Sequence, residues 1–321
     1  MAQPLVSVLI SNYNYGRYLP RAIDSALGQT YQPCEIIVID DGSTDDSRQI
    51  IEGYGNRIIP ILQSNGGQAS ALNTGFTASR GDVICLLDAD DVWLPTKVER
   101  VVTALKAYPK ASVVYHRVQT VDQLEQRRGQ PWPPYPVIRG SIAQQVMDTG
   151  GWWPFPPSTG LSFPRSFIAK VIPIPELEYH LCADAYLADL APFFGEVIGI
   201  EDALSLFRIH STNHWSHPIE IQRRSLHSHE LRVKVLNRTL QSTGIQAQIS
   251  LQQHWPYQRL KHNLGEGKSL LMLSQLALNH PWELRLTSRL KLLLDLWIKT
   301  IWIKTGWIKH LWKKPRSITN L

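Results

Sequence analysis

Carboxylates follow directly after two apolar runs of this 321-residue chain. The run that ends at Ile39 is followed by Asp40 and Asp41, and the run that ends at Leu87 is followed by Asp88-Ala89-Asp90. Hard divalent cations such as Mg²⁺ and Mn²⁺ prefer oxygen ligands, and proteins usually supply one or two carboxylates beside the phosphates of a substrate. An Asp-x-Asp sequence alone is a weak signal, but its place after an apolar run strengthens it. These residues therefore predict a metal-assisted phosphate site.

Turn formation is the alternative explanation, because Asp, Gly and Ser are also ordinary turn and N-cap residues. We assign that role to Asp45 and Asp46. For Asp41 and Asp90 we favour a functional role, since a third polar set, residues 11–16 (SNYNYG), also follows an apolar run.

Segments of strand length alternate with segments of helix length through the first 115 residues. The predicted strands are 6–10, 35–39, 58–62, 83–87 and 113–115, and the predicted helices are 18–28, 45–54, 69–78 and 95–107. Such alternation indicates a parallel sheet with helices on both faces. Ligands of open α/β sheets bind beyond the carboxyl ends of the strands, so one crevice would receive all three polar sets.

The alternation stops after Tyr115. Two segments rich in Pro and aromatic residues, 131–136 and 150–158, predict loops that form a lid, an acceptor wall or a packed surface. A helix is predicted over 181–194, then a strand and a polar loop, and helices from Ile219 onward. We therefore expect three segments, which are residues 1–115, 116–216 and a helical C-terminal region over 217–321.

The composition narrows the class of protein. A formal net charge of +6 indicates an anionic partner. Three widely spaced cysteines form neither a disulfide framework nor a zinc pattern, which favours a reducing cytosol. The N-terminus lacks the pattern of a signal peptide, and no run of about 18 apolar residues predicts a spanning helix. Neither GxxxxGK[ST] nor GxGxxG occurs, which argues against a P-loop ATPase and a nicotinamide enzyme.

Three stretches together resemble glycosyltransferase family 2. They are VSVLISNYNYGRYLPRAIDSALGQTY, EIIVIDDGSTDDS and NGGQASALNTGFTASRGDVICLLDADDVWLP. The resemblance is dense over residues 5–115 and looser up to about residue 216. It implies a GT-A type α/β fold, with a Rossmann-like, mixed but mostly parallel sheet flanked by helices, to which this chain adds a helical C-terminal extension. It also implies transfer from a nucleotide-diphosphate sugar with inversion.

The resemblance implies roles for the residues that match the family's motifs. Tyr13 would stack on the nucleotide base, with Ser11 close to it, and Asp41 would bond the base, typically uracil. Asp88 would face the ribose and the metal. Asp90 would ligate the divalent metal, Mn²⁺ or Mg²⁺, that bridges the diphosphate.

In inverting members the catalytic base lies on a later helix, usually in a Glu-Asp pair. We place the base at Asp184, although Ala183 stands where the family has Glu, and Asp189 is the competing candidate. The reaction needs a carboxylate that removes the proton of the acceptor hydroxyl as that hydroxyl attacks the anomeric carbon.

The segment FRIHSTNHWS resembles the family's Arg-x-His segment. It makes His210 a candidate third metal ligand or phosphate contact, with a structural histidine as the alternative. Arg208 would pair with a phosphate or with a carboxylate of the site. The Gln-x-x-Arg-Trp motif of processive members is missing, which favours the addition of single sugars.

The C-terminal stretch repeats Trp and Lys every five residues. The repeated residues are Trp297, Trp302, Trp307 and Trp312, and Lys299, Lys304, Lys309 and Lys314. On a helix, one side would carry Leu286, Leu290, Leu293, Leu294, Trp297, Ile301, Ile308, Leu311 and Trp312. The opposite side would carry Lys291, Asp295, Lys299, Lys309 and Lys313. Such a helix is typical of attachment to an anionic bilayer surface. Packing on the domain or on a second subunit is the alternative.

We therefore expect an inverting, metal-dependent glycosyltransferase on the cytoplasmic face of the plasma membrane. It would move a sugar from a UDP-linked donor to a hydroxyl of a glycan or lipid-linked acceptor in cell-surface polysaccharide synthesis, and we expect no nucleic-acid partner. One alternative is a sugar nucleotidyltransferase, which would need a Gly-rich basic loop near the first strand. Another is a non-catalytic nucleotide-sugar-binding or scaffold protein, which only Ala183 favours. The sequence predicts neither the donor sugar nor the linkage.

Overall fold

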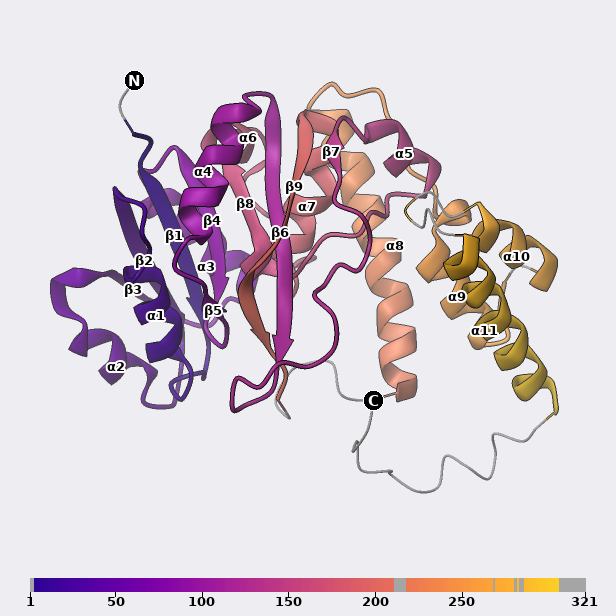
Figure 1. Cartoon of the computed structure of the whole chain (residues 1–321), viewed down its shortest axis with the longest axis horizontal. Helices are drawn as coiled ribbons and strands as arrows, with labels where there is room; N and C mark the ends of the chain where they lie inside the picture. Colours follow the sequence, from indigo (N-terminus) through magenta and orange to yellow (C-terminus); the bar gives the residue numbers. More distant parts are fainter. Residues whose placement is uncertain (1–2, 211–217, 268, 280–281, 283–285, 306–321) are drawn as a thin grey trace.

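A computed structural model describes residues 3–210, 218–267, 269–279, 282 and 286–305. Nine strands of these residues form one mixed sheet in the order β3-β2-β1-β4-β8-β6-β9-β5, with β7 paired to β9. The strands are β1 Val6–Asn12, β2 Cys34–Asp41, β3 Ile59–Gln63, β4 Val83–Asp88, β5 Val92–Trp93, β6 Ala111–Val121, β7 Arg139–Gly140, β8 Leu161–Pro164 and β9 Glu196–Arg208. Figure 1 shows the sheet between its covering helices.

The first four long strands are parallel, as the alternating pattern predicts. The helices that connect and cover them are α1 Leu19–Leu27, α2 Ser47–Gly53, α3 Gln68–Ala78 and α4 Lys97–Ala107. Along β1, Val8 and Ile10 pack in a core with α1 and α4, while Leu9 packs with α3 on the other face. Because both faces are covered, the central strands are apolar throughout.

The second half of the sheet departs from the sequence prediction. β6 extends well beyond the predicted 113–115 and pairs along its length with β9. β8 and the helix α6 Arg165–Val171 lie in a region with no predicted element, and β8 is antiparallel to both β4 and β6. Four-residue β8 is too short for a periodic signal, and it follows a Pro-rich loop. The division expected at residue 115 falls inside β6, so the first two segments share one sheet.

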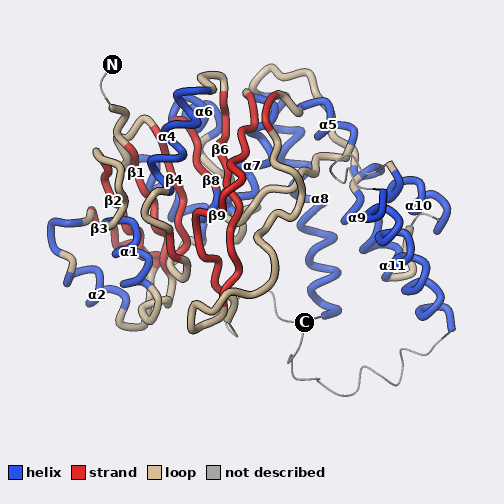
Figure 2. Tube along the Cα trace, viewed as in Figure 1, coloured by secondary structure: helices blue, strands red, loops and turns tan. Residues whose placement is uncertain are grey.

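The remaining helices lie mainly on one side of the sheet. They are α5 Ala143–Asp148, α7 Ala183–Phe194, α8 Pro218–Ser242, α9 Trp255–Asn263, α10 Leu270–Leu278 and α11 Leu286–Thr305. α8 contributes Val235, Leu236 and Leu240 to the large core that also holds α7. α9, α10 and α11 share a small separate core and form one end of the molecule (Figures 1 and 2). None of the described helices is long and apolar enough to cross a membrane.

Candidate active site

Strand register brings the predicted polar sets to one edge of the sheet. Ser11 of β1 lies between Ile39 of β2 and Asp88 of β4, and Asn12 lies beside Asp40. Because these strands are parallel, their carboxyl ends meet at this edge. The polar sets therefore lie at one edge of the sheet, and the shared crevice stays a prediction.

Asp40 and Asp41 both make local hydrogen bonds in addition to any functional role. Asp40 is fully buried and accepts bonds from Asn12 (2.9 Å), from the Ser43 backbone and from Arg48 (2.9 Å). The Asp41 carboxyl accepts bonds from the Gln63 side chain at 2.7 Å and from the backbone N–H groups of Gly66 and Gly67 at 2.9 and 2.8 Å. Asp41 therefore fixes the loop that leads into α3, and its role toward the base stays a prediction.

Asp41→Ala is expected to destabilise the fold by about 3 kcal/mol, because it leaves two backbone N–H groups of a tight loop without their acceptor. Denaturant unfolding measures this, with Asp46→Ala as the matched control since Asp46 is exposed. Equal free energies of unfolding for Asp41→Ala and Asp46→Ala would show that the loop does not depend on Asp41.

Tyr13 is available to a ligand. Its side chain is 44% exposed, and it lies on the turn that follows β1. The next residue, Asn14, adopts a positive φ of 58° and its side-chain oxygen accepts a 2.7 Å hydrogen bond from the Thr44 N–H. The turn after β1 is thus fixed to the turn after β2, which holds Tyr13 in place beside the strand ends.

Four carboxyl groups gather beyond β4 and the start of α7. Burial, then the charges of Asp90 and Asp184, raise the pKa of Asp88 well above its ordinary value, and a hydrogen bond from Ser158 opposes this shift. Burial, then Asp90 and Asp88, raise the pKa of Asp91 in the same way. The structure therefore brings the predicted base, Asp184, into the electrostatic field of the Asp-x-Asp sequence.

His210 contacts the Asp-x-Asp sequence directly. Its Nε2 atom lies 2.9 Å from Oδ2 of Asp90, and both side chains are almost fully buried. The ring stacks on Tyr18 with a centroid distance of 4.9 Å and meets Tyr15 edge-on at 5.5 Å. His210 thus belongs to the site, and its role as metal ligand or phosphate contact stays a prediction.

Arg208 forms hydrogen bonds with the last residue of the Asp-x-Asp sequence and with the residue after it. Its backbone N–H donates to Asp91 and its Nε donates to the Asp90 carbonyl, both at 2.8 Å. Its terminal nitrogens donate to Glu125 and to the Gln123 carbonyl, and the side chain is only 3% exposed. Of the two predicted partners, a carboxylate and a phosphate, these contacts favour the carboxylate.

The two candidate bases on α7 have different surroundings. Both oxygens of Asp189 accept hydrogen bonds from Arg232 of α8, at 2.7 and 2.8 Å, and Asp189 is buried. Asp184 is half-buried in the first turn of the helix and faces the acids of β4. Burial raises the pKa of Asp184, while a hydrogen bond from Ser158 and the charge of Arg232 lower it. A half-buried carboxyl group close to the other acids suits a general base, whereas Asp189 has the contacts of a structural ion pair.

Similarity to known proteins agrees with this geometry. The family model of glycosyl transferase family 2 matches residues 7–165. An uncharacterized glycosyltransferase of Nostoc sp. is 36% identical over 288 residues, which is 86% of this chain and 89% of that protein. The chain belongs to glycosyltransferase family 2. The enzyme class that the resemblance implies, a glycosyltransferase, is thereby confirmed.

Solved structures share the fold of this glycosyltransferase. TarS of S. aureus, residues 1–349 in complex with UDP-GlcNAc, aligns with a TM-score of 0.55 at 16% identity, over 94% of this chain and 92% of that one. A mannosyltransferase of Pyrobaculum calidifontis in complex with GDP-Man and Mn²⁺ aligns with a TM-score of 0.50 at 17% identity, over 95% and 89% of the two chains. The predicted GT-A fold class is therefore confirmed.

The donor chemistry of this family 2 site fits a divalent cation. Burial, and after it the neighbouring negative charges, raise the pKa of Asp88 and Asp91, and Oδ2 of Asp91 is buried without a hydrogen-bond partner among the described residues. A cation near the group would offset this repulsion. Among the described residues, no three His, Cys, Asp or Glu side chains converge as a metal site, and Asp90 contacts His210.

The structure adds residues to the site of this glycosyltransferase that sequence reasoning missed. Burial and the charges of Asp90, Asp88 and Asp91 raise the pKa of Tyr15, so its hydroxyl lies close to these acids. Ser158 of the 3₁₀ turn η2 Ser158–Gly160 interacts with both Asp88 and Asp184. Glu125 binds Arg208 and Arg21 together. Tyr15 lies in the polar set 11–16, and Ser158 lies in the segment 150–158 for which an acceptor wall was one expectation, whereas no local pattern marked Glu125.

Proposed function

We propose that this glycosyltransferase moves a sugar from a UDP-linked donor to a hydroxyl of a glycan or lipid-linked acceptor, with inversion and with a divalent metal. The observation that carries the proposal is the gathering of Asp88, Asp90 and Asp184 at the sheet edge. Two of these acids belong to a strand end and one to a helix that reaches the same edge from much later in the chain. This is the arrangement that donor binding and proton removal from an acceptor both require.

Each of the predicted residues at the sheet edge has one role in this reaction. Tyr13 stacks on the base, with Ser11 and Asp41 beside it, while Asp88 and Asp90 hold Mn²⁺ or Mg²⁺. When bound, the cation supplies positive charge against the leaving diphosphate. Asp184 removes the proton of the acceptor hydroxyl as the oxygen attacks the anomeric carbon. Since this is a single displacement, the configuration of that carbon inverts.

A thermal-shift screen of UDP-sugars and GDP-sugars with Mn²⁺ tests the donor, since ligands that bind the native state raise the melting temperature. UDP-sugars are expected to raise it and GDP-sugars are not. NMR of the product formed from the best donor reports the anomeric configuration. A stabilising GDP-sugar, or a product with retained configuration, would contradict the proposal.

Two exposed leucines lie shortly before α7, the helix that carries Asp184. Leu177 is 95% exposed and Leu181 is 52% exposed, and both precede the helix that begins beside Asp184. Apolar side chains at this place suit an acceptor with a lipid part, which supports a lipid-linked glycan of the cell surface.

A second proposal is that the C-terminal helices attach the enzyme to the cytosolic face of an anionic membrane. On α11, Leu286, Leu290, Leu294, Trp297 and Ile298 are between 44% and 64% exposed, and Leu271 and Met272 of α10 are exposed as well. This apolar surface lies on the outer side of α11, because Asp295 binds Arg259 and Thr300 binds His262, both in α9. Leu293 instead packs inward, against the small core. Of the predicted apolar side, Leu293 thus packs on the C-terminal helices and Trp297 donates a hydrogen bond to Ser274 of α10, while Leu286, Leu290 and Leu294 are exposed.

The basic part of the predicted tail supports the same proposal. Lys291 is exposed on α11, and five further lysines follow in the sequence at 299, 304, 309, 313 and 314. The structure does not describe the side chains of these five lysines, nor those of Trp302, Trp307 and Trp312. Each lysine close to an anionic surface contributes about 1 kcal/mol, which salt weakens.

The variant Leu290→Glu/Leu294→Glu is expected to lose flotation with vesicles of anionic lipid at low salt, because two charges would enter the apolar surface. The control Leu62→Glu/Leu124→Glu adds the same charge at exposed leucines of the sheet half and should float like wild type. If wild type stays in the soluble fraction and light scattering shows a dimer that the first variant dissociates, α11 is a subunit interface instead.

A further inference from the structure

The proposed base Asp184 lies in the first turn of α7, and the residue before that turn is strained. This residue, Cys182, has a φ of 60°, in the left-handed region that is unfavourable for residues other than glycine. Among the described residues, the Cys182 side chain caps no N–H group of the helix. Because the first N–H groups of a helix have no partner inside the helix, the start of α7 depends on contacts from other elements.

Gln68 of α3 supplies one of these contacts. Its side-chain oxygen accepts a hydrogen bond from the N–H of Ala183, the first residue of α7, at 2.8 Å. Ala183 is fully buried and Gln68 is half-buried, so water competes little for this N–H. The bond from Gln68 therefore takes the place of the bond that an N-cap side chain makes in other helices.

Gln68 joins the two helices a second time through its backbone. Its N–H donates to the His180 carbonyl oxygen at 2.8 Å. The residue before it, Gly67, has a φ of +86°, and a Cβ atom there would lie 2.6 Å from the same carbonyl oxygen, so this approach requires glycine. The N–H of Gly67 in turn donates to the Asp41 carboxyl at 2.8 Å. The start of α3 is thus fixed both to the end of β2 and to the segment before α7.

We infer that Gln68 is a positioning residue for sugar transfer, which holds the first turn of α7 so that the Asp184 carboxyl faces the Asp-x-Asp sequence. It acts through the Ala183 N–H. A general base must lie within hydrogen-bond reach of the proton that it removes, and misplacement by about 1 Å can lower a rate by about two orders of magnitude. The inference rests on the proposed function, because it takes Asp184 as the base.

The variant Gln68→Met removes the acceptor of the Ala183 N–H and keeps the length of the side chain. It is expected to lower kcat for sugar transfer by about tenfold and to leave the KM of the donor within about twofold of wild type. In hydrogen exchange followed by mass spectrometry, the peptide with the first turn of α7 should exchange about tenfold faster, because one hydrogen bond is lost. Gln68→Glu keeps an acceptor for this N–H. It should restore the slow exchange and most of kcat on the plateau of the pH profile.

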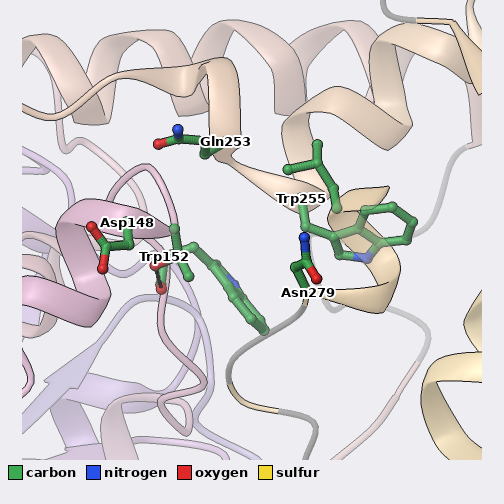
Figure 3. A pocket seen from close by; sticks show the side chains of 7 residues that line it. Asp148, Trp152, Gln253, Trp255 and Asn279 are labelled. Carbon is green, nitrogen blue, oxygen red and sulfur yellow. Dashed lines mark hydrogen bonds between the residues drawn. The ribbon is translucent and has the colours of Figure 1, made fainter. Parts of the chain in front are cut away.

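Gln253→Met is the matched control. Gln253 is an exposed glutamine at a cavity of about 320 Å³, whose walls come from α5, α9, α10 and the segments next to them (Figure 3). The substitution removes the same amide group outside α3 and α7. It should leave kcat, the KM of the donor and the exchange of the α7 peptide like wild type.

The inference and the proposed function fail in different ways. Unchanged exchange of the α7 peptide in Gln68→Met, or a fall in kcat that Gln68→Glu does not restore, would overturn the role of Gln68. A raised KM of the donor with unchanged kcat would overturn it as well, since Gln68 would then serve the donor. If wild type transfers no sugar, the proposed function is wrong, and faster exchange in Gln68→Met than in Gln253→Met would still support Gln68 as the residue that holds α7.

Discussion

Asp184→Asn is expected to lower kcat for sugar transfer by at least about two orders of magnitude, the usual scale for loss of a general base. Asn keeps the size of the side chain but cannot accept the proton of the acceptor hydroxyl. Nucleotide affinity should stay close to the wild-type value, because no predicted contact to the base or ribose involves this residue. Steady-state kinetics and calorimetry with UDP measure the two quantities.

Asp189→Asn separates the two candidate bases by a different readout. Asp189 forms two hydrogen bonds with Arg232 in a buried site, so its replacement leaves a guanidinium without its counter-charge. Breaking such a pair costs about 3 kcal/mol or more, and the melting temperature should fall. Asp184→Asn should melt close to wild type. The assignment is wrong if Asp189→Asn is inactive with an unchanged melting temperature while Asp184→Asn still transfers sugar.

Asp90→Ala is expected to abolish transfer and the metal-dependent part of nucleotide binding. The sign of its effect on stability follows from the electrostatics of the site. Burial raises the pKa of Asp88 and Asp91 most, and the charge of Asp90 raises both further, so the charge of Asp90 opposes the charges of its two neighbours. Removal of Asp90 relieves this repulsion. The melting temperature without metal should therefore be unchanged or higher, apart from the lost contact to His210.

Addition of Mn²⁺ provides a readout that is independent of activity. Wild-type protein should gain melting temperature with Mn²⁺ and UDP, since both bind the native state, while Asp90→Ala should gain much less. Asp46→Ala removes an exposed acid outside the site and should respond like wild type. An equal Mn²⁺ response in wild type and Asp90→Ala would remove Asp90 from the metal site.

Much of the nucleotide-binding half could be predicted from the sequence. Its strands and helices are consecutive βα units, in which each element buries residues at its own period, so local patterns indicate both the elements and their parallel order. The strand ends then placed Ser11, Asp41 and Asp88 at one edge. The predicted ends differ from β1, β2 and β4 by only one to a few residues, which is the usual uncertainty of element boundaries.

Local sequence patterns do not predict the second half of the sheet. β8 pairs with β4 and β6, which lie far from it in sequence, and its few residues carry no period. Ser158, which interacts with Asp88 and Asp184, precedes that strand in a Pro-rich loop whose sequence is compatible with a lid, an acceptor wall or a packed surface. The pairing of strands that are distant in sequence therefore determines the position of Ser158 in the site.

Helix periodicity predicted most of the residues that share a side of α11, although Leu293 packs inward, and it did not predict whether that side is covered. Leu290, Leu294 and Trp297 do share an apolar surface, and it faces outward because Asp295 and Thr300 bind α9. The sequence of a helix indicates which residues share a side, but not which side contacts the neighbouring helices.

The choice between Asp184 and Asp189 as the catalytic base depends most clearly on the tertiary structure. The sequence by itself predicts two acids on one helix, a strand end that binds a metal, and the chemistry of the family. Only the tertiary structure brings Arg232, 43 residues later, against Asp189 and leaves Asp184 beside Asp88. The reason is physical: the function of a carboxyl group depends on the charges and the solvent around it, and these come from elements that are distant in sequence.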